Sequence, residues 1–317
     1  MLNIFKNAVA TPANQRFGNR VSLTRIGSAV LVLALLLGLV SLHWVPNVEM
    51  DDARRQLKRG WLLLTGRLVD VGGYRLYIEC RGNGSPAVIL DAGLNFGGGS
   101  WKEVQTELES LTRVCTYDRA GIRYSDRGIE PGTSKQVVRD LHTLLKNAKI
   151  SAPYVLAGHS FGGLNMRLYA CEYPQEVVGM VFIDSSHEDQ YSRFAALMPE
   201  LAARNYLRHE GGGNDERMDL LAGADQIRNA PPLPAIPLVV LTAGKTEWPI
   251  QASAAEARLA KMEMQDHLAQ LIPNSKHIIV ENCGHFIQWC NPSVVIASIK
   301  DVIRTARNPS PSQPSEK

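Results

Sequence analysis

Two hydrophobic patterns alternate along most of the chain. Short apolar runs are separated by longer segments in which apolar residues recur every three or four positions, a pattern typical of strands alternating with helices in an α/β sheet. Ser134 and Pro292 fit the first turns of two of these helices. We predict strands at 67–71, 74–80, 86–91, 113–117, 154–158, 179–184, 237–242 and 277–281, and helices at 100–110, 134–148, 161–172, 252–270 and 292–305.

Residues 185–237 interrupt this alternation. The segment contains two short helical patterns, a run of three glycines at 211–213 and a proline-rich return at 231–234. A long insertion with short helices of its own is typical of a functional cover over a binding site. We therefore predict a small lid laid over the sheet.

Residues 26–45 (IGSAVLVLALLLGLVSLHWV) carry no formal charge over a length that matches a membrane-spanning helix. A cleaved signal peptide is the alternative, but 25 residues precede the segment and no small-x-small cleavage site occurs before Trp44 and Pro46. Four bases lie before the segment and three acids soon after it, so the positive-inside rule predicts a cytoplasmic N-terminus. Everything after residue 46 is then extracytoplasmic, and periplasmic in a Gram-negative bacterium.

Composition and charge narrow the possible classes of protein. The chain has 317 residues, of which 45% are hydrophobic and 21% charged, enough for one large globular domain. Its formal charge of +3 resides in the basic tail 1–25, which has four bases and no acid, so the rest carries 30 bases against 31 acids. A near-neutral domain argues against nucleic-acid binding. We expect residues 46–65 to be a linker and 306–317, rich in Pro and Ser, to be a disordered tail.

The strongest chemical motif is Gly158-His159-Ser160-Phe161-Gly162, between a predicted strand and a predicted helix. Small residues on both sides of Ser160 allow the strand and helix to approach closely around a sharp turn. The serine hydroxyl then projects from the sheet edge beside a helix N-terminus, which favours nearby negative charge. We predict that Ser160 is a nucleophile; an incidental serine in a glycine-rich turn is the plain alternative.

A serine nucleophile needs a base that accepts its proton. Of eight histidines, His285 follows the last predicted strand on a loop at the same sheet edge as Ser160 and is our candidate base. His159 adjoins the serine but points away on a tight turn, so we assign it to packing.

A carboxylate should orient that base, and two are in suitable positions. Glu247 follows the predicted strand 237–242, and Asp184 ends the preceding strand. Asp184 begins the predicted lid, where Ser185 and Ser186 offer local hydrogen-bond partners. We favour Glu247 and keep Asp184 as the alternative.

Donors for an oxyanion complete the site. The main-chain N–H of Phe161 follows the nucleophile, and Leu94 is best placed on the glycine-rich loop after the strand 86–91. That loop lacks the Gly-Lys-Ser/Thr ending of a phosphate-binding P-loop and does not match Gly-x-Gly-x-x-Gly. Nucleotide binding is therefore not expected.

Four blocks together resemble the α/β-hydrolase superfamily over residues 66–305. They are 90–93 (LDAG) with Trp101, 117–121 (YDRAG) followed by 124–126, 158–163 (GHSFGG), and 284–286 (GHF) with Pro292. The resemblance implies an eight-stranded, mostly parallel sheet with the second strand antiparallel, helices on both faces and a lid after the sixth strand. It also implies the chain order serine, acid, histidine. A Gly244-x-x-Glu247 spacing after the seventh strand resembles the family's usual acid loop and supports Glu247.

The resemblance also bears on the cysteines and on two charged residues. If its strand order holds, Cys80 and Cys115 are neighbours, and an extracytoplasmic location permits them to pair. Cys283 and Cys290 form a weaker second candidate pair, which leaves Cys171 free and buried. Asp118 and Arg119 are expected to brace the end of the fourth strand. The family's common His-Gly in the oxyanion loop is Ala92-Gly93 here, which leaves the support of the Leu94 loop undefined.

These expectations combine into one functional hypothesis. We predict a membrane-anchored, extracytoplasmic serine hydrolase that cleaves a carboxylic ester or related small-molecule acyl substrate without a cofactor. Peptidase, lactonase, thioesterase or C–C hydrolase activity would use the same residues, and a non-catalytic binding protein is a remote alternative. No metal site is expected, because Cys283, Cys290 and His285 lack a second pair of nearby ligands.

Overall fold

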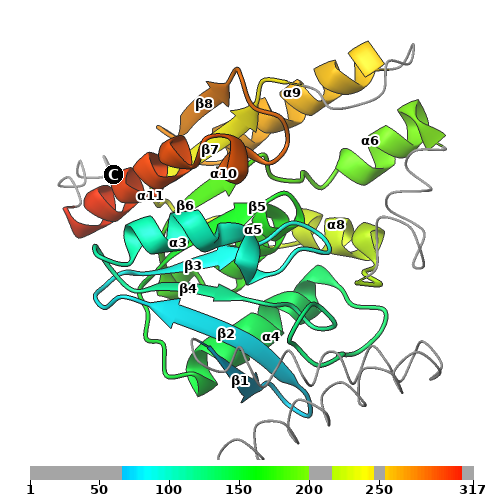
Figure 1. Ribbon diagram of the computed structural model, residues 1–317. Helices are drawn as coiled ribbons and strands as arrows, with labels where there is room; N and C mark the ends of the chain where they lie inside the picture. The colour runs from blue at the N-terminus through cyan, green and yellow to red at the C-terminus, as the bar shows by residue number, and fades with distance from the viewer. Residues whose placement is uncertain (1–65, 200–215, 246–253, 309–317) are drawn as a thin grey trace, which may run out of the picture. The chain divides into compact units, whose positions relative to one another are not determined.

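A single eight-stranded sheet forms the centre of the computed structural model, which describes residues 66–199, 216–245 and 254–308 (Figure 1). The strand order is β1-β2-β4-β3-β5-β6-β7-β8, and β2 runs antiparallel to both of its neighbours while the pairs from β4 through β8 are parallel. This confirms the predicted sheet. The strands are β1 (Arg67–Asp70), β2 (Arg75–Arg81), β3 (Ala87–Asp91), β4 (Val114–Tyr117), β5 (Tyr154–His159), β6 (Val177–Ile183), β7 (Leu238–Ala243) and β8 (Lys276–Val280).

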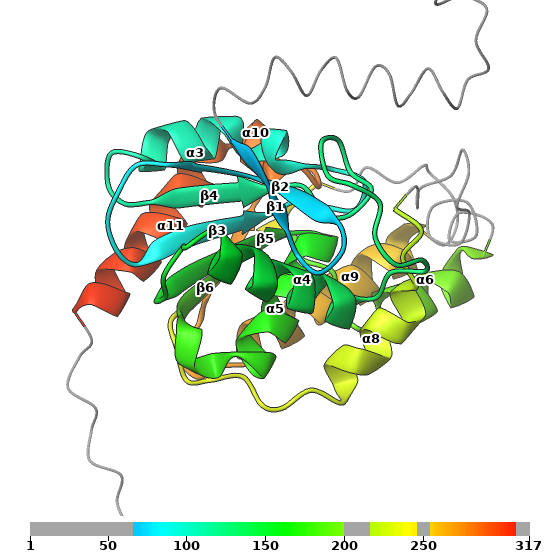
Figure 2. The same ribbon diagram turned by 90° about the horizontal axis from the view of Figure 1, so that it is seen from below.

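Helices cover both faces of the sheet, as Figure 2 shows. Successive residues of the central strands point to opposite faces, so Ile89 and Leu156 join one buried apolar cluster with α4 and α5 while Val88 and Val155 join another with α3 and α11. The helices are α3 (Lys102–Leu108), α4 (Ser134–Asn147), α5 (Phe161–Glu172), α6 (Gln190–Leu197), α8 (Leu220–Arg228), α9 (Ala254–Gln270), α10 (Ile287–Cys290) and α11 (Pro292–Arg307), with 3-10 turns η2 (Gly98–Trp101) and η3 (Pro174–Glu176).

The predicted helix starts agree with the structure. Ser134 and Pro292 are the first residues of α4 and α11. The side chains of Thr133 and Asn291 cap these helices by accepting main-chain N–H groups from Gln136 and Val294. The short helix α10 was not predicted, because four residues are too few to show a helical period.

The insertion after the sixth strand contains α6 and α8, in agreement with its two helical patterns. Helix α6 packs against α9, and α8 packs against α4 and α5. The glycine run at 211–213 lies outside the described residues.

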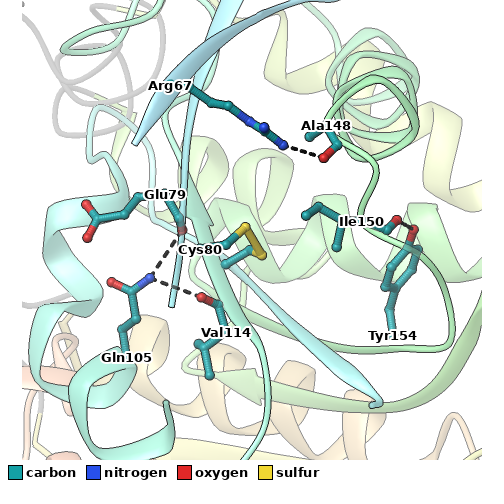
Figure 3. The surroundings of a disulfide bond; sticks show 9 residues. Arg67, Glu79, Cys80, Gln105, Val114, Ala148, Ile150 and Tyr154 are labelled. Carbon is teal, nitrogen blue, oxygen red and sulfur yellow. Dashed lines mark hydrogen bonds between the residues drawn. A yellow bond between two sulfur atoms is a disulfide. The ribbon is translucent and has the colours of Figure 1, made fainter. Parts of the chain in front are cut away.

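Two disulfides connect neighbouring elements, and both predicted pairs are present. Cys80 on β2 and Cys115 on β4 are register partners and are bonded, as Figure 3 shows. Cys283 and Cys290 bridge the loop after β8 to the end of α10. Cys171 in α5 is free and buried, as expected.

Several predicted segments lie outside the described residues. They are the basic tail 1–25, the apolar segment 26–45, the linker 46–65 and most of the tail 306–317, of which α11 takes the first two residues. Within residues 66–199, 216–245 and 254–308, no helix is long and apolar enough to cross a membrane.

Candidate active site

Ser160 occupies the turn between β5 and α5. Its backbone angles are φ 54° and ψ −123°, a conformation that a non-glycine residue adopts only when the surrounding structure imposes it. A Cβ atom on Gly158 would lie 2.5 Å from the carbonyl oxygen of Gly162, so only glycine permits this approach of strand and helix. The Ser160 N–H donates to the carbonyl of Ile183 at 3.1 Å and its carbonyl accepts from Ser186 N–H at 2.9 Å. These bonds hold the strained turn against the end of β6.

His285 and Asp184 form the central pair of the site. His285, on the loop after β8, donates from Nδ1 to Asp184 Oδ2 at 2.6 Å. Asp184 directly follows β6, its side chain is fully buried, and its φ of 44° is, like that of Ser160, in the left-handed region. Strained non-glycine residues cluster at functional sites, so Ser160 and Asp184 both indicate one here.

The carboxylate of Asp184 has three partners. Oδ1 accepts the main-chain N–H of Ala243 at 2.9 Å, and Oδ2 accepts from both His285 and the Nζ of Lys261, the latter at 2.7 Å. Burial alone would raise the pKa of Asp184, but the Lys261 charge and the His285 hydrogen bond outweigh burial and hold that pKa well below its usual range. Asp184 is therefore an anion at neutral pH.

The structure brings the alternative acid, Asp184, into contact with His285. We favoured Glu247 by position, but Asp184 already takes the only Nδ1–H of His285, and a neutral imidazole has one such donor to give an orienting carboxylate. Glu247 lies outside the described residues. Both β6 and β7 end at the edge that carries His285, so their positions in the sequence did not distinguish the two candidates.

His159 does more than pack. Its ring is buried and lies 4.6 Å from the His285 ring, and its Nε2–H donates to the His285 carbonyl at 2.9 Å. Burial, together with the nearby His285, lowers the pKa of His159 to about 3, so the ring stays neutral. The residue beside the serine thus anchors the main chain of the loop that carries His285.

The predicted oxyanion loop lies next to Ser160. A Cβ atom on Gly93 would lie 2.9 Å from His159 Nδ1 and 3.4 Å from Ser160 Cβ, which places this loop against the turn between β5 and α5. Leu94 is the next residue, and Phe161 is the first residue of α5. Both main-chain N–H groups thus belong to segments that adjoin the serine.

Arg119 supports the oxyanion loop, although we expected it to brace β4. The guanidinium is buried and donates to the carbonyls of Ala92 at 2.7 Å and Gly93 at 2.6 Å, and to Asp91 Oδ1 at 2.5 Å. Asp118 does brace the end of β4, because its Oδ1 accepts the Gly98 N–H at 2.8 Å. The predicted oxyanion loop has Ala92-Gly93 in place of the family's common His-Gly, and Arg119 supports the loop at these two residues.

Glu216 completes this buried network and was not anticipated. Its carboxylate accepts from Arg119 Nε at 2.8 Å and Nη2 at 2.6 Å. It also accepts the N–H of Asn95, while its own N–H donates to Asn95 Oδ1 at 3.2 Å. Glu216 is 97 residues from Arg119 in the chain, and no local pattern marks it, so only the folded structure identifies it.

One group of metal-ligand side chains occurs in the described part of the chain: His187, Glu188 and His267. Both oxygens of Glu188 are bound by Arg167, at 2.5 and 3.1 Å. His187 Nδ1 accepts the Asp189 N–H at 3.0 Å, so Nε2 carries the proton and donates to His267 at 2.6 Å. These contacts connect His187 to His267 and Glu188 to Arg167 by hydrogen bonds.

Comparisons with known proteins agree with this architecture. The family model for the alpha/beta hydrolase fold matches residues 86–212. The Bacillus subtilis (strain 168) protein YqjL is 27% identical over 250 residues, which cover 78% of this chain and 94% of YqjL. A thermophilic esterase from Thermogutta terrifontis superposes with a TM-score of 0.55 at 20% identity, over 76% of this chain and 98% of the esterase.

The enol-lactonase from Burkholderia xenovorans LB400 superposes with a TM-score of 0.54 at 17% identity, over 75% of this chain and all of the lactonase. At these identities the likeness concerns the fold. Together with the family-model match over residues 86–212 and the sheet order described above, it shows that the chain has the α/β-hydrolase fold.

Proposed function

We propose that this chain is a serine hydrolase that cleaves a carboxylic ester or related acyl substrate through an acyl-enzyme. The observation that carries the proposal is the 2.6 Å hydrogen bond from His285 Nδ1 to the buried anion Asp184, together with the strained turn that carries Ser160. In this assignment Ser160 is the nucleophile, His285 the base and Asp184 the orienting acid.

The reaction follows from these roles. Ser160 Oγ attacks the acyl carbon while His285 Nε2 takes its proton, and Asp184 stabilises the resulting imidazolium. The N–H groups of Leu94 and Phe161 receive the oxyanion. Collapse of the tetrahedral species breaks the acyl–oxygen bond, and His285 gives the proton to the departing alcohol. Water then enters and attacks the acyl carbon while His285 takes its proton, and collapse of the second tetrahedral species releases the acid as His285 returns the proton to Ser160 Oγ.

Two points support a substrate with an acyl–oxygen bond, such as an ester or a lactone. The solved structures named above are an esterase and an enol-lactonase, which both act on acyl–oxygen bonds. His285 is partly exposed, so a small ester can reach its side of the site. Peptidase and thioesterase activity are decided by the substrate panel in the experiment below.

The test compares wild type with Ser160→Ala, Asp184→Asn and Glu247→Gln on p-nitrophenyl acetate, a peptide anilide and a thioester, with the melting temperature measured for each. Ser160→Ala should abolish turnover, and Asp184→Asn should lower kcat on the order of 10⁴-fold at an unchanged fold. Glu247→Gln should remain within tenfold of wild type. A large loss in Glu247→Gln with a nearly active Asp184→Asn would restore Glu247 as the acid, and a Ser160→Ala variant that retains activity would refute the proposal.

We also propose that residues 26–45 anchor the protein in a membrane with its hydrolase domain outside the cytoplasm. The uncharged length of the segment and the excess of bases before it support this orientation. Both disulfides fit an oxidising compartment.

A further inference from the structure

Lys261 contacts the acid of the site directly. It lies on α9, which packs against β7, and its Nζ is 2.7 Å from Asp184 Oδ2. The same oxygen accepts the Nδ1–H of His285 at 2.6 Å. The lysine side chain is only 16% exposed and that of Asp184 is fully buried, so solvent screens this ammonium weakly. Neither the sequence motifs nor the family pattern pointed to a lysine here.

The position of this charge affects the histidine. In serine hydrolysis the orienting carboxylate stabilises the imidazolium that forms during the reaction. An ammonium on the same carboxylate oxygen neutralises part of that carboxylate's charge and repels the imidazolium. Lys261 therefore favours the neutral imidazole, which is the form that accepts the serine proton.

The other ionisable groups around the pair do not replace this effect. His159, at the end of β5, faces the His285 ring but is neutral, because burial lowers its pKa to about 3. Lys245, after β7, lies beside the same loop through its N–H bond to the Cys283 carbonyl and is exposed to solvent. Lys261 is the buried cation that contacts Asp184.

We propose that Lys261 is a positioning residue that holds Asp184 in place and keeps His285 in its base form at lower pH than the carboxylate alone would allow. The inference rests on the proposed serine hydrolase function. Loss of the ammonium should make the imidazolium easier to form. The acidic limb of the kcat/KM profile should then move to higher pH, by about one pH unit for a partly buried charge at this range.

The experiment measures kcat/KM on p-nitrophenyl acetate from pH 4.5 to 9 for wild type, Lys261→Met and Lys261→Arg. Glu263→Gln is the matched control, because Glu263 lies on the same helix and accepts an exposed hydrogen bond from Arg193 at 2.6 Å. Lys261→Met should show the displaced limb, whereas Lys261→Arg and Glu263→Gln should retain the wild-type limb. If Lys261→Met turns over too slowly, the rate of fluorophosphonate labelling at each pH gives the same profile, and Lys261→Gln serves if Lys261→Met does not fold.

The outcomes separate the two proposals. An acidic limb at the same pH in Lys261→Met and wild type, with activity reduced equally at every pH, means that Lys261 has a structural role only and overturns the inference. A shift in Glu263→Gln as large as that in Lys261→Met would attribute the effect to α9 and also overturn it. A wild type that neither turns over esters nor reacts with fluorophosphonate refutes the serine hydrolase function itself.

Discussion

Removal of the Glu216 carboxylate should weaken both the fold and the oxyanion loop. Glu216 binds Arg119 through two hydrogen bonds and receives the N–H of Asn95, the residue after Leu94. Arg119 in turn holds the carbonyls of Ala92 and Gly93. In Glu216→Ala the buried Arg119 guanidinium keeps Asp91 as an ion-pair partner but loses the Glu216 carboxylate. The oxyanion loop also loses the hydrogen bond from the Asn95 N–H to Glu216.

The magnitude follows from burial. The side chains of Arg119 and Glu216 are 2% and 1% exposed, so water cannot replace the lost partner. Removal of one member of such a pair typically costs about 3–5 kcal/mol of unfolding free energy. In a domain of this size each kcal/mol corresponds to about 2–4 °C, so the melting temperature should fall by about 10 °C. Complete loss of one oxyanion donor costs on the order of 10²–10³ in kcat, and a loosened loop should cost about tenfold.

The assay is thermal unfolding together with kcat on p-nitrophenyl acetate, measured below the transition of the variant. Glu130→Gln is the control, because Glu130 pairs with Arg217 and Arg127 at the surface, where such pairs contribute about 0–1 kcal/mol. The control should change neither quantity appreciably. A Glu216→Ala variant whose melting temperature stays within about 2 °C of wild type would refute the reasoning about the buried network.

Three further predictions concern the remaining features. His159→Leu should lower kcat about tenfold, because the loop that carries His285 loses a hydrogen-bond donor. In wild type the free energy of unfolding should fall as the pH drops from 6.5 toward about 3, because the unfolded chain then binds a proton that buried His159 does not. Urea titrations at several pH values should show a shallower fall in His159→Leu. The double variant Cys283→Ser/Cys290→Ser should lose kcat on p-nitrophenyl acetate because the disulfide closes the loop that carries His285, whereas a serine replacement of the β2–β4 disulfide should lower only the melting temperature; equal kcat losses in both would contradict this. An alkaline phosphatase fused to the C-terminus should be active in a bacterial host if residues 26–45 are an anchor with a cytoplasmic N-terminus, and a stable but inactive fusion would overturn that orientation.

The hydrophobic pattern was sufficient to predict the strands, and local motifs pointed to two members of the candidate site. All eight predicted strands formed within two residues of their predicted bounds, because the central strands are buried on both faces of the sheet and therefore appear in the sequence as short continuous apolar runs. Ser160 was recognisable because glycines stand two positions before and after it, where strand and helix approach closely, and His285 because it lies on the loop after the last strand.

The acid and its supporting residues depend on side-chain contacts that no pattern records. Asp184 and Glu247 both follow strands that end at the same edge, and only the 2.6 Å bond to His285 distinguishes Asp184. Lys261 is 77 residues from Asp184, and no local pattern in helix α9 marks this lysine as a partner of the acid. Contacts of this kind arise when distant elements pack, so they could not be predicted from the chain alone.

The most direct test of the central claim is to locate the residue that a fluorophosphonate probe modifies. Folded wild-type protein is treated with the probe, digested, and analysed by mass spectrometry, with Ser160→Ala and heat-denatured wild type as controls. A nucleophilic serine activated by the His285–Asp184 pair predicts one phosphonylated peptide, modified at Ser160, and no adduct in either control. An adduct at another serine, such as Ser185, or no adduct on the folded protein, would contradict the assignment of Ser160 as the nucleophile.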